Sequence, residues 1–87
     1  MDTGGVARKA PRWANPVGIR FGGYGSSELI RGPEQALEFL TGRWPVTEGS
    51  YYDLAKSKCA AAAQRRASAE EAREIFISAA IEADVFA

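Results

Sequence analysis

Histidine is absent from this 87-residue chain, and cysteine and methionine occur once each. The lack of histidine removes the commonest general base and the commonest metal-ligating side chain. Cys59 cannot form a disulfide within the chain, so we expect packing alone to stabilise the fold. No stretch approaches the ~20 apolar residues that span a bilayer, and residues 1–12 lack the apolar run of a secretory signal. We therefore expect a cytoplasmic protein with no membrane segment, cofactor or metal.

An excess of charge is absent as well, because eleven Lys and Arg balance eleven Asp and Glu. With 46% apolar residues, this composition is that of a folded chain rather than a disordered one. It also argues against binding of nucleic acid or anionic lipid through bulk electrostatics. The length allows one small domain. We expect a flexible basic arm over residues 1–12 and a single α+β domain over residues 13–87.

A period of two begins after Pro16, where Val17, Ile19 and Phe21 alternate with Gly18 and Arg20. This alternation predicts a half-buried strand. The segment 22–26 contains three glycines, and a second short strand-like run follows over residues 27–31. A glycine loop that holds phosphate needs a helix directly after it, whereas this one precedes a strand pattern. We therefore expect an antiparallel β-hairpin.

Two helices follow the predicted hairpin. Pro33 suits the first position of one helix, and Gly42 is expected to end it in the left-handed conformation. Ser50 is expected to begin the next helix, with Asp53 completing a variant of the capping box. The apolar side of that second helix includes Cys59, which we expect to be a buried, inert thiol.

The third helix carries the strongest periodic signal in the chain. Ser68 and Glu71 form a capping box at its start. An unbroken apolar stripe then follows at helical spacing, made of Ala72, Ile75, Phe76, Ala79, Ala80 and Ala83. The fold class is therefore α+β, a two-stranded antiparallel hairpin packed against three helices in the order β-β-α-α-α.

Two isoleucines of this helix, Ile77 and Ile81, fall outside the stripe and form a second ridge. Either they make a homodimer contact, or another helix of the same chain covers them. Exposure would likewise decide the role of the aromatic residues near the helix ends. If these aromatic residues are buried, they close the core. If several are exposed together, they mark a binding surface.

A basic group at the N-terminus offers an alternative function. Its residues are Arg8, Lys9 and Arg12, followed by Trp13, and the hairpin arginines Arg20 and Arg31 extend it. Such a group can grip phosphates while the aromatic ring stacks on a base. The zero net charge favours a solvated tail instead, since nucleic-acid-binding domains normally show a basic excess.

The chain also resembles a family of short uncharacterised proteins from rhizobia and related alphaproteobacteria, which carries a domain-of-unknown-function label. The resemblance covers about residues 13–84. It rests on Trp13-x-x-Pro16-Val17-x-Ile19, Gly32-Pro33, Trp44-Pro45, Gly49-x-x-Tyr52-x-x-Ala55-x-x-x-Cys59 and Ser68-x-Glu70-x-Ala72-Arg73-x-x-Phe76. It implies no activity and no catalytic or binding residue.

No spacing of carboxylates, serines or arginines suggests an active site, so we expect a protein that is not an enzyme. Our first hypothesis is a protein-protein interaction module whose partner is a second copy of itself or another protein, with Ile77 and Ile81 at the contact. Weak binding of nucleic acid through the basic group is the second hypothesis.

Overall fold

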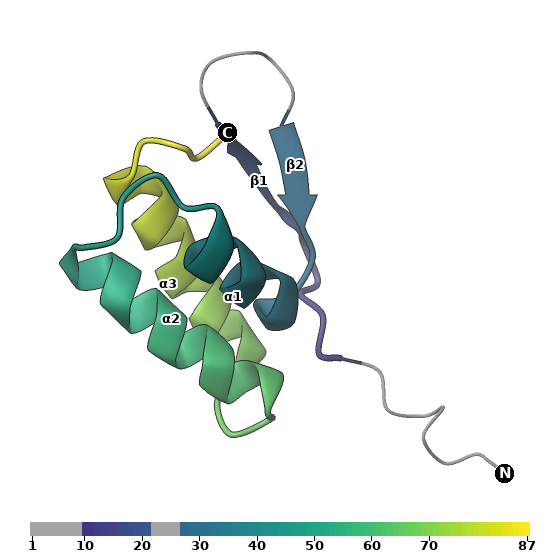
Figure 1. Cartoon of the computed structure of the whole chain (residues 1–87). Helices are drawn as coiled ribbons and strands as arrows, with labels where there is room; N and C mark the ends of the chain where they lie inside the picture. Colours follow the sequence, from purple (N-terminus) through teal and green to yellow (C-terminus); the bar gives the residue numbers. More distant parts are fainter. Residues whose placement is uncertain (1–9, 22–26) are drawn as a thin grey trace, which may run out of the picture.

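The computed structural model describes residues 10–21 and 27–87. Its elements are β1 (Val17–Arg20), β2 (Ser27–Ile30), α1 (Pro33–Gly42), α2 (Ser50–Ala63) and α3 (Ala69–Glu82). This order confirms the predicted β-β-α-α-α arrangement. The hairpin lies on one side of α1 and α3, and α2 lies on their other side (Figure 1). The predicted glycine turn falls within residues 22–26, outside the described part of the chain.

The two strands pair antiparallel, with Val17 opposite Ile30 and Arg20 opposite Ser27. Val17, Ile19 and Ile30 are buried, as the alternation predicts. A feature that the sequence did not indicate lies on the other edge of β1. There the backbone N–H of Arg20 donates to the carbonyl of Val85, and the N–H of Ala87 donates to the carbonyl of Gly18, at 2.7 and 3.0 Å. The C-terminal segment thus lies along β1 and extends the sheet.

Phe76 of α3 lies at the centre of the core. Its ring packs between the indoles of Trp13 and Trp44, with centroids 5.7 and 5.4 Å away. The indole N–H of Trp13 donates to the carbonyl of Ala69 at 2.7 Å, which fixes the N-terminal segment to the start of α3. The predicted stripe of α3 is confirmed, because all its members are buried or packed against the core. Trp13, Trp44 and Tyr52 therefore close the core, whereas Tyr51, the fourth of the aromatic residues near the helix ends, is exposed.

The helix ends differ from expectation in two of three places. At α3 the amide of Glu71 donates to Ser68 Oγ at 3.1 Å, which confirms that cap. Gly42 is the last residue of α1, but it does not adopt the expected left-handed conformation. In the part of the chain that the structure describes, Gly49 is the only glycine with positive φ. The Ser50 cap is also wrong. The residue before α2 is Gly49, which has no side chain to cap the helix. Instead, the carboxylate of Glu82 from α3 accepts hydrogen bonds from the first amides of α2.

Candidate interaction surface

The outer side of the α2–α3 pair carries three large apolar side chains that face solvent. Tyr51 is 46% exposed, Leu54 42% and Ile81 59%. A shallow groove of about 280 Å³ lies between the helices and is lined by Tyr51, Ser78, Ile81 and Glu82. Leu54 continues the same side of α2 one turn beyond Tyr51. We call the surface formed by Tyr51, Leu54, Ser78 and Ile81 the α2/α3 face.

The predicted ridge of Ile77 and Ile81 is divided by the structure. Ile81 is exposed, whereas Ile77 is partly buried and packs against the core. The reason is the position of α3, which contacts α1, α2 and β1, so that one of its flanks is covered within the chain. The two isoleucines therefore do not form one exposed surface, and the neighbours of Ile81 on the α2/α3 face come from α2.

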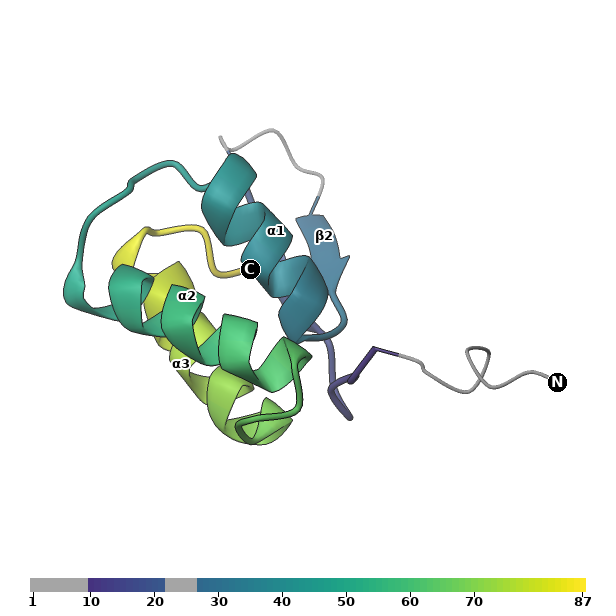
Figure 2. The same cartoon turned by 60° about the horizontal axis from the view of Figure 1, so that its bottom comes forward.

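Leu54 was not singled out from the sequence, and Tyr51 was considered only as one of the aromatic residues near the helix ends. Leu54 lies 200° from Tyr52 on a helical wheel, and Tyr52 is the first buried residue of α2. The sequence signal for Leu54 is therefore an apolar residue on the side of the helix opposite the core stripe. The sequence does not show that Tyr51 lies beside α3, because this depends on how the two helices pack. Figure 2 shows α2 and α3 side by side.

Charges at the two ends of the α2/α3 face are compensated within the chain. At one end the carboxylate of Glu82 accepts from the amides of Tyr52 and Tyr51 at 3.1 and 3.4 Å, where the helix dipole of α2 is positive. At the other end Lys58 Nζ lies 3.6 Å from Glu71 Oε1. These contacts also show that α2 and α3 run antiparallel. The charged groups at these two ends are thus compensated within the chain.

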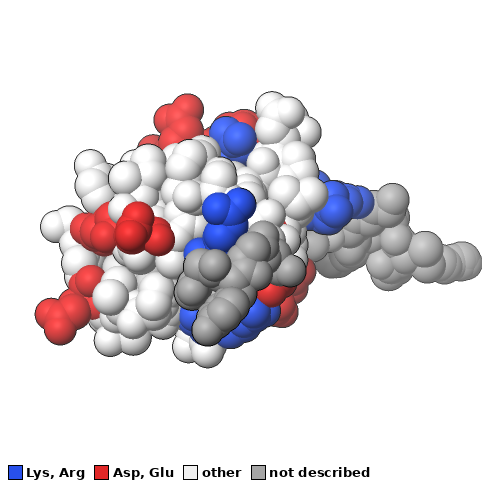
Figure 3. Space-filling model, turned by 90° about the horizontal axis from the view of Figure 1, so that it is seen from above, with Lys and Arg blue, Asp and Glu red and all other residues white. Residues whose placement is uncertain are grey.

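The described residues of the basic group do not come together as one surface. Arg8 and Lys9 lie outside the described residues. Trp13 is only 5% exposed, so its ring is enclosed in the core and does not present a face on which a base could stack. Figure 3 shows acidic as well as basic side chains on the side of the molecule that it displays.

The two hairpin arginines lie at opposite ends of the strands. Arg20 pairs with Ser27, whereas Arg31 follows Ile30, the partner of Val17. At ~3.3 Å per residue, roughly 10 Å separates these ends of the hairpin. Arg31 instead shares a pocket with Arg12, while Arg20 borders a different hollow beside the C-terminal segment.

Cys59 is buried on the core side of α2, as expected. Burial raises the pKa of its thiol from 9.0 to about 12, which disfavours the nucleophilic thiolate. Among residues 10–21 and 27–87, no three or more Asp, Glu, Cys or His side chains form a group that could hold a metal ion. In the same ranges no helix has the length and apolar character needed to cross a membrane.

These features define a small α+β domain in which a β-hairpin and three helices enclose one aromatic core. The sequence profile of one family matches residues 15–87, and its description is "Protein of unknown function (DUF982)". The chain belongs to this family, which confirms the resemblance to a domain of unknown function. Searches of curated proteins and of solved structures each returned no match.

Proposed function

We propose that this chain is a cytoplasmic, non-enzymatic interaction module that binds a second copy of itself through the α2/α3 face. The observation that carries the proposal is the exposure of Tyr51 and Ile81, which line one groove between adjacent helices, and of Leu54 one turn beyond Tyr51 on α2. Burying these side chains against an apolar surface contributes roughly 25 cal/mol for each Å² removed from water. Tyrosine is moreover enriched at protein interfaces.

Charge favours a second copy as the occupant of the face. When a surface meets its own copy across a two-fold axis, unpaired charges near the axis meet their own sign, which costs free energy. Here Glu82 is bound by the α2 amides and Lys58 lies beside Glu71, so these charges at the two ends of the face are already compensated within the chain. The formal net charge of zero further removes long-range repulsion between copies.

The geometry of the helix pair suits the same partner. Antiparallel helices such as α2 and α3 pack onto an equivalent pair to form a four-helix arrangement, a common solution for small helical interfaces. The two copies of the groove then lie across the symmetry axis, where each receives side chains from the other subunit. This predicts Ile81 and Tyr51 at the centre of the contact.

Sedimentation velocity over a low to high micromolar range tests the proposal. We expect concentration-dependent dimerisation of the wild type, and a shift to monomer for Ile81→Lys and Leu54→Lys. Leu29→Lys is the matched control, because Leu29 is 48% exposed but lies on the hairpin. A wild type that stays monomeric throughout, or a control that weakens the dimer as much as Ile81→Lys, would show that the α2/α3 face has another role.

A further inference from the structure

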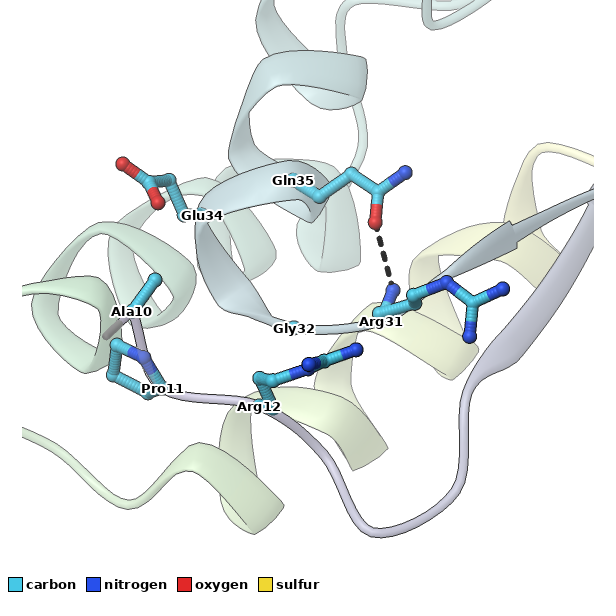
Figure 4. Close-up of a pocket in the computed structure, with 7 residues that line it drawn as sticks. All are labelled: Ala10, Pro11, Arg12, Arg31, Gly32, Glu34 and Gln35. Atoms are coloured by element: carbon cyan, nitrogen blue, oxygen red, sulfur yellow. Dashed lines mark hydrogen bonds between the residues drawn. The ribbon is translucent and has the colours of Figure 1, made fainter.

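A pocket of about 350 Å³ lies where the N-terminal segment crosses the start of α1. Its walls are formed by Ala10, Pro11, Arg12, Arg31, Gly32, Glu34 and Gln35. Figure 4 shows the side chains of Arg12 and Arg31 extending to the same side of the backbone at Gly32, while Glu34 points to the other side. The pocket is remote from the α2/α3 face and shares no residue with it.

Gly32 is what permits the two arginines to lie side by side. A Cβ at this position would collide with the carbonyl oxygen of Pro11, so only glycine lets the segment pass so close to the start of the helix. The amide of Arg31 donates to Gln35 Oε1 at 2.9 Å, which fixes the backbone at the far wall. The amino group of Gln35 remains a further donor at the rim of the pocket.

Neither guanidinium in the pocket is engaged by another described residue. Elsewhere Arg43 pairs with Glu28 at 2.8 Å and stacks over Phe39, and Arg73 donates to the carbonyl of Asn15 at 2.8 Å. The side chains of Arg12 and Arg31, by contrast, are exposed, and their guanidinium groups make no hydrogen bond or ion pair with residues 10–21 or 27–87. Two cations with no described partner on one pocket repel each other unless an anion lies between them.

We propose that this pocket binds the phosphate group of a small anionic ligand. Two guanidinium groups supply planar, forked donors and two positive charges, which match a phosphate monoester that carries about −1.5 to −2 charge. A single carboxylate needs only one such fork. The volume is in the range of small-molecule sites rather than of an extended polymer groove.

Titration of the full chain with inorganic phosphate, followed by NMR, tests the assignment. We expect saturable shifts of the Gly32 and Gln35 amides and of the Arg12 and Arg31 Nε–H signals, and no such shifts with sodium chloride at equal ionic strength. Arg12→Gln and Arg31→Gln should each raise Kd at least about tenfold, since each removes charge-assisted hydrogen bonds. Arg20→Gln, which removes the same charge outside the pocket, should change Kd less than about twofold.

Glu34→Gln provides a variant that should bind phosphate more tightly, and misfolding would not produce a gain in affinity. It removes the one negative charge of the pocket wall, so phosphate should bind about two- to threefold more tightly. Shifts that do not saturate, or that chloride reproduces, would overturn the proposal. So would an oligonucleotide that binds without competition from phosphate and is weakened equally by Arg20→Gln, because an extended nucleic-acid surface would then replace the pocket. None of these outcomes depends on dimerisation through the α2/α3 face.

Discussion

Gly49 lies directly against the carboxylate of Glu82, although 33 positions separate the two residues in the sequence. A Cβ at Gly49 would lie 2.5 Å from Glu82 Oε1. The same carboxylate accepts from the backbone amides of Tyr51 and Tyr52. The end of α3 therefore supplies the cap for the beginning of α2, and Gly49 provides the space in which that carboxylate fits.

Replacement of Gly49 by alanine should destabilise the fold. Gly49 has φ 138° and ψ 151°, a region that is essentially restricted to glycine, and the added methyl group would also displace Glu82. We expect a loss of about 1–3 kcal/mol in the free energy of unfolding, measured by urea denaturation. Gly42→Ala is the control. A Cβ there meets nothing within 4 Å, so we expect it to be neutral or to stabilise by about 0.4–1 kcal/mol. Equal losses in both variants would contradict the role of Gly49.

Removal of the Glu82 carboxylate should weaken α2 at its first turn. Glu82→Ala leaves the amides of Tyr51 and Tyr52 without their acceptor, and losing a cap costs about 0.5–2 kcal/mol. Glu82→Gln keeps an acceptor oxygen but loses the charge that favours the helix dipole, so its loss should be intermediate.

Glu74→Ala is the matched control for this cap, because Glu74 is an exposed glutamate of α3 whose carboxylate has no described partner. It should change stability by less than about 0.5 kcal/mol. Unfolding is followed by tryptophan fluorescence at a concentration at which sedimentation shows monomer. If Glu74→Ala and Glu82→Ala cost the same, the cap contributes nothing measurable.

The contrast between α3 and this cap shows which parts of the fold were predictable. The α3 stripe and the Ser68 cap depend on residues within a few positions of one another, so spacing alone revealed them. The Glu82 cap joins residues about 30 positions apart, and no local pattern marks it. Ser50 has a side chain that can cap a helix, but the carboxylate of Glu82 from the neighbouring helix α3 performs this role.

The candidate surfaces also depend partly on local sequence patterns and partly on contacts between distant residues. Exposure of Ile81 was among the sequence-based alternatives, but its companions Tyr51 and Leu54 emerge only when α2 packs beside α3. Similarly, Arg12 and Arg31 were both noted as basic residues, yet only the close crossing at Gly32 brings them into one pocket. The pairing of the C-terminal segment with β1 had no sequence signal, because Val85 and Phe86 are too few to show a period.

The two buried tryptophans should differ in their response to replacement by phenylalanine. Trp13 Nε1 donates to Ala69, whereas the buried Nε1 of Trp44 has no partner among the described residues. Both substitutions remove the same ring volume, but Trp13→Phe also loses a hydrogen bond, and Trp44→Phe also removes an unsatisfied donor. We expect Trp13→Phe to be more destabilising by about 1–3 kcal/mol in urea unfolding. A larger loss for Trp44→Phe would mean that its N–H has a partner in solution, such as an ordered water.

Stability should fall at alkaline pH because of Cys59. Burial raises the pKa of the folded thiol to about 12, whereas the unfolded thiol keeps its ordinary pKa of 9.0. Below pH 9 the thiol is protonated in both states, and its contribution to stability is fully present. Between pH 9 and 12 the unfolded chain releases this proton while the folded chain retains it, so the free energy of unfolding declines, by at most about 1.4 kcal/mol per pH unit.

The test compares the pH slopes of two proteins that differ only at the thiol. Cys59→Ala removes the thiol and keeps every lysine and tyrosine, and its loss of stability from pH 8.5 to 10.5 should be shallower than that of the wild type, as measured by urea denaturation. The native thiol should also react with a disulfide reagent only as fast as the chain opens, because the thiolate is the nucleophile. Identical slopes for the two proteins, or rapid reaction of the native thiol, would show that Cys59 is accessible to solvent and ionises at its ordinary pKa.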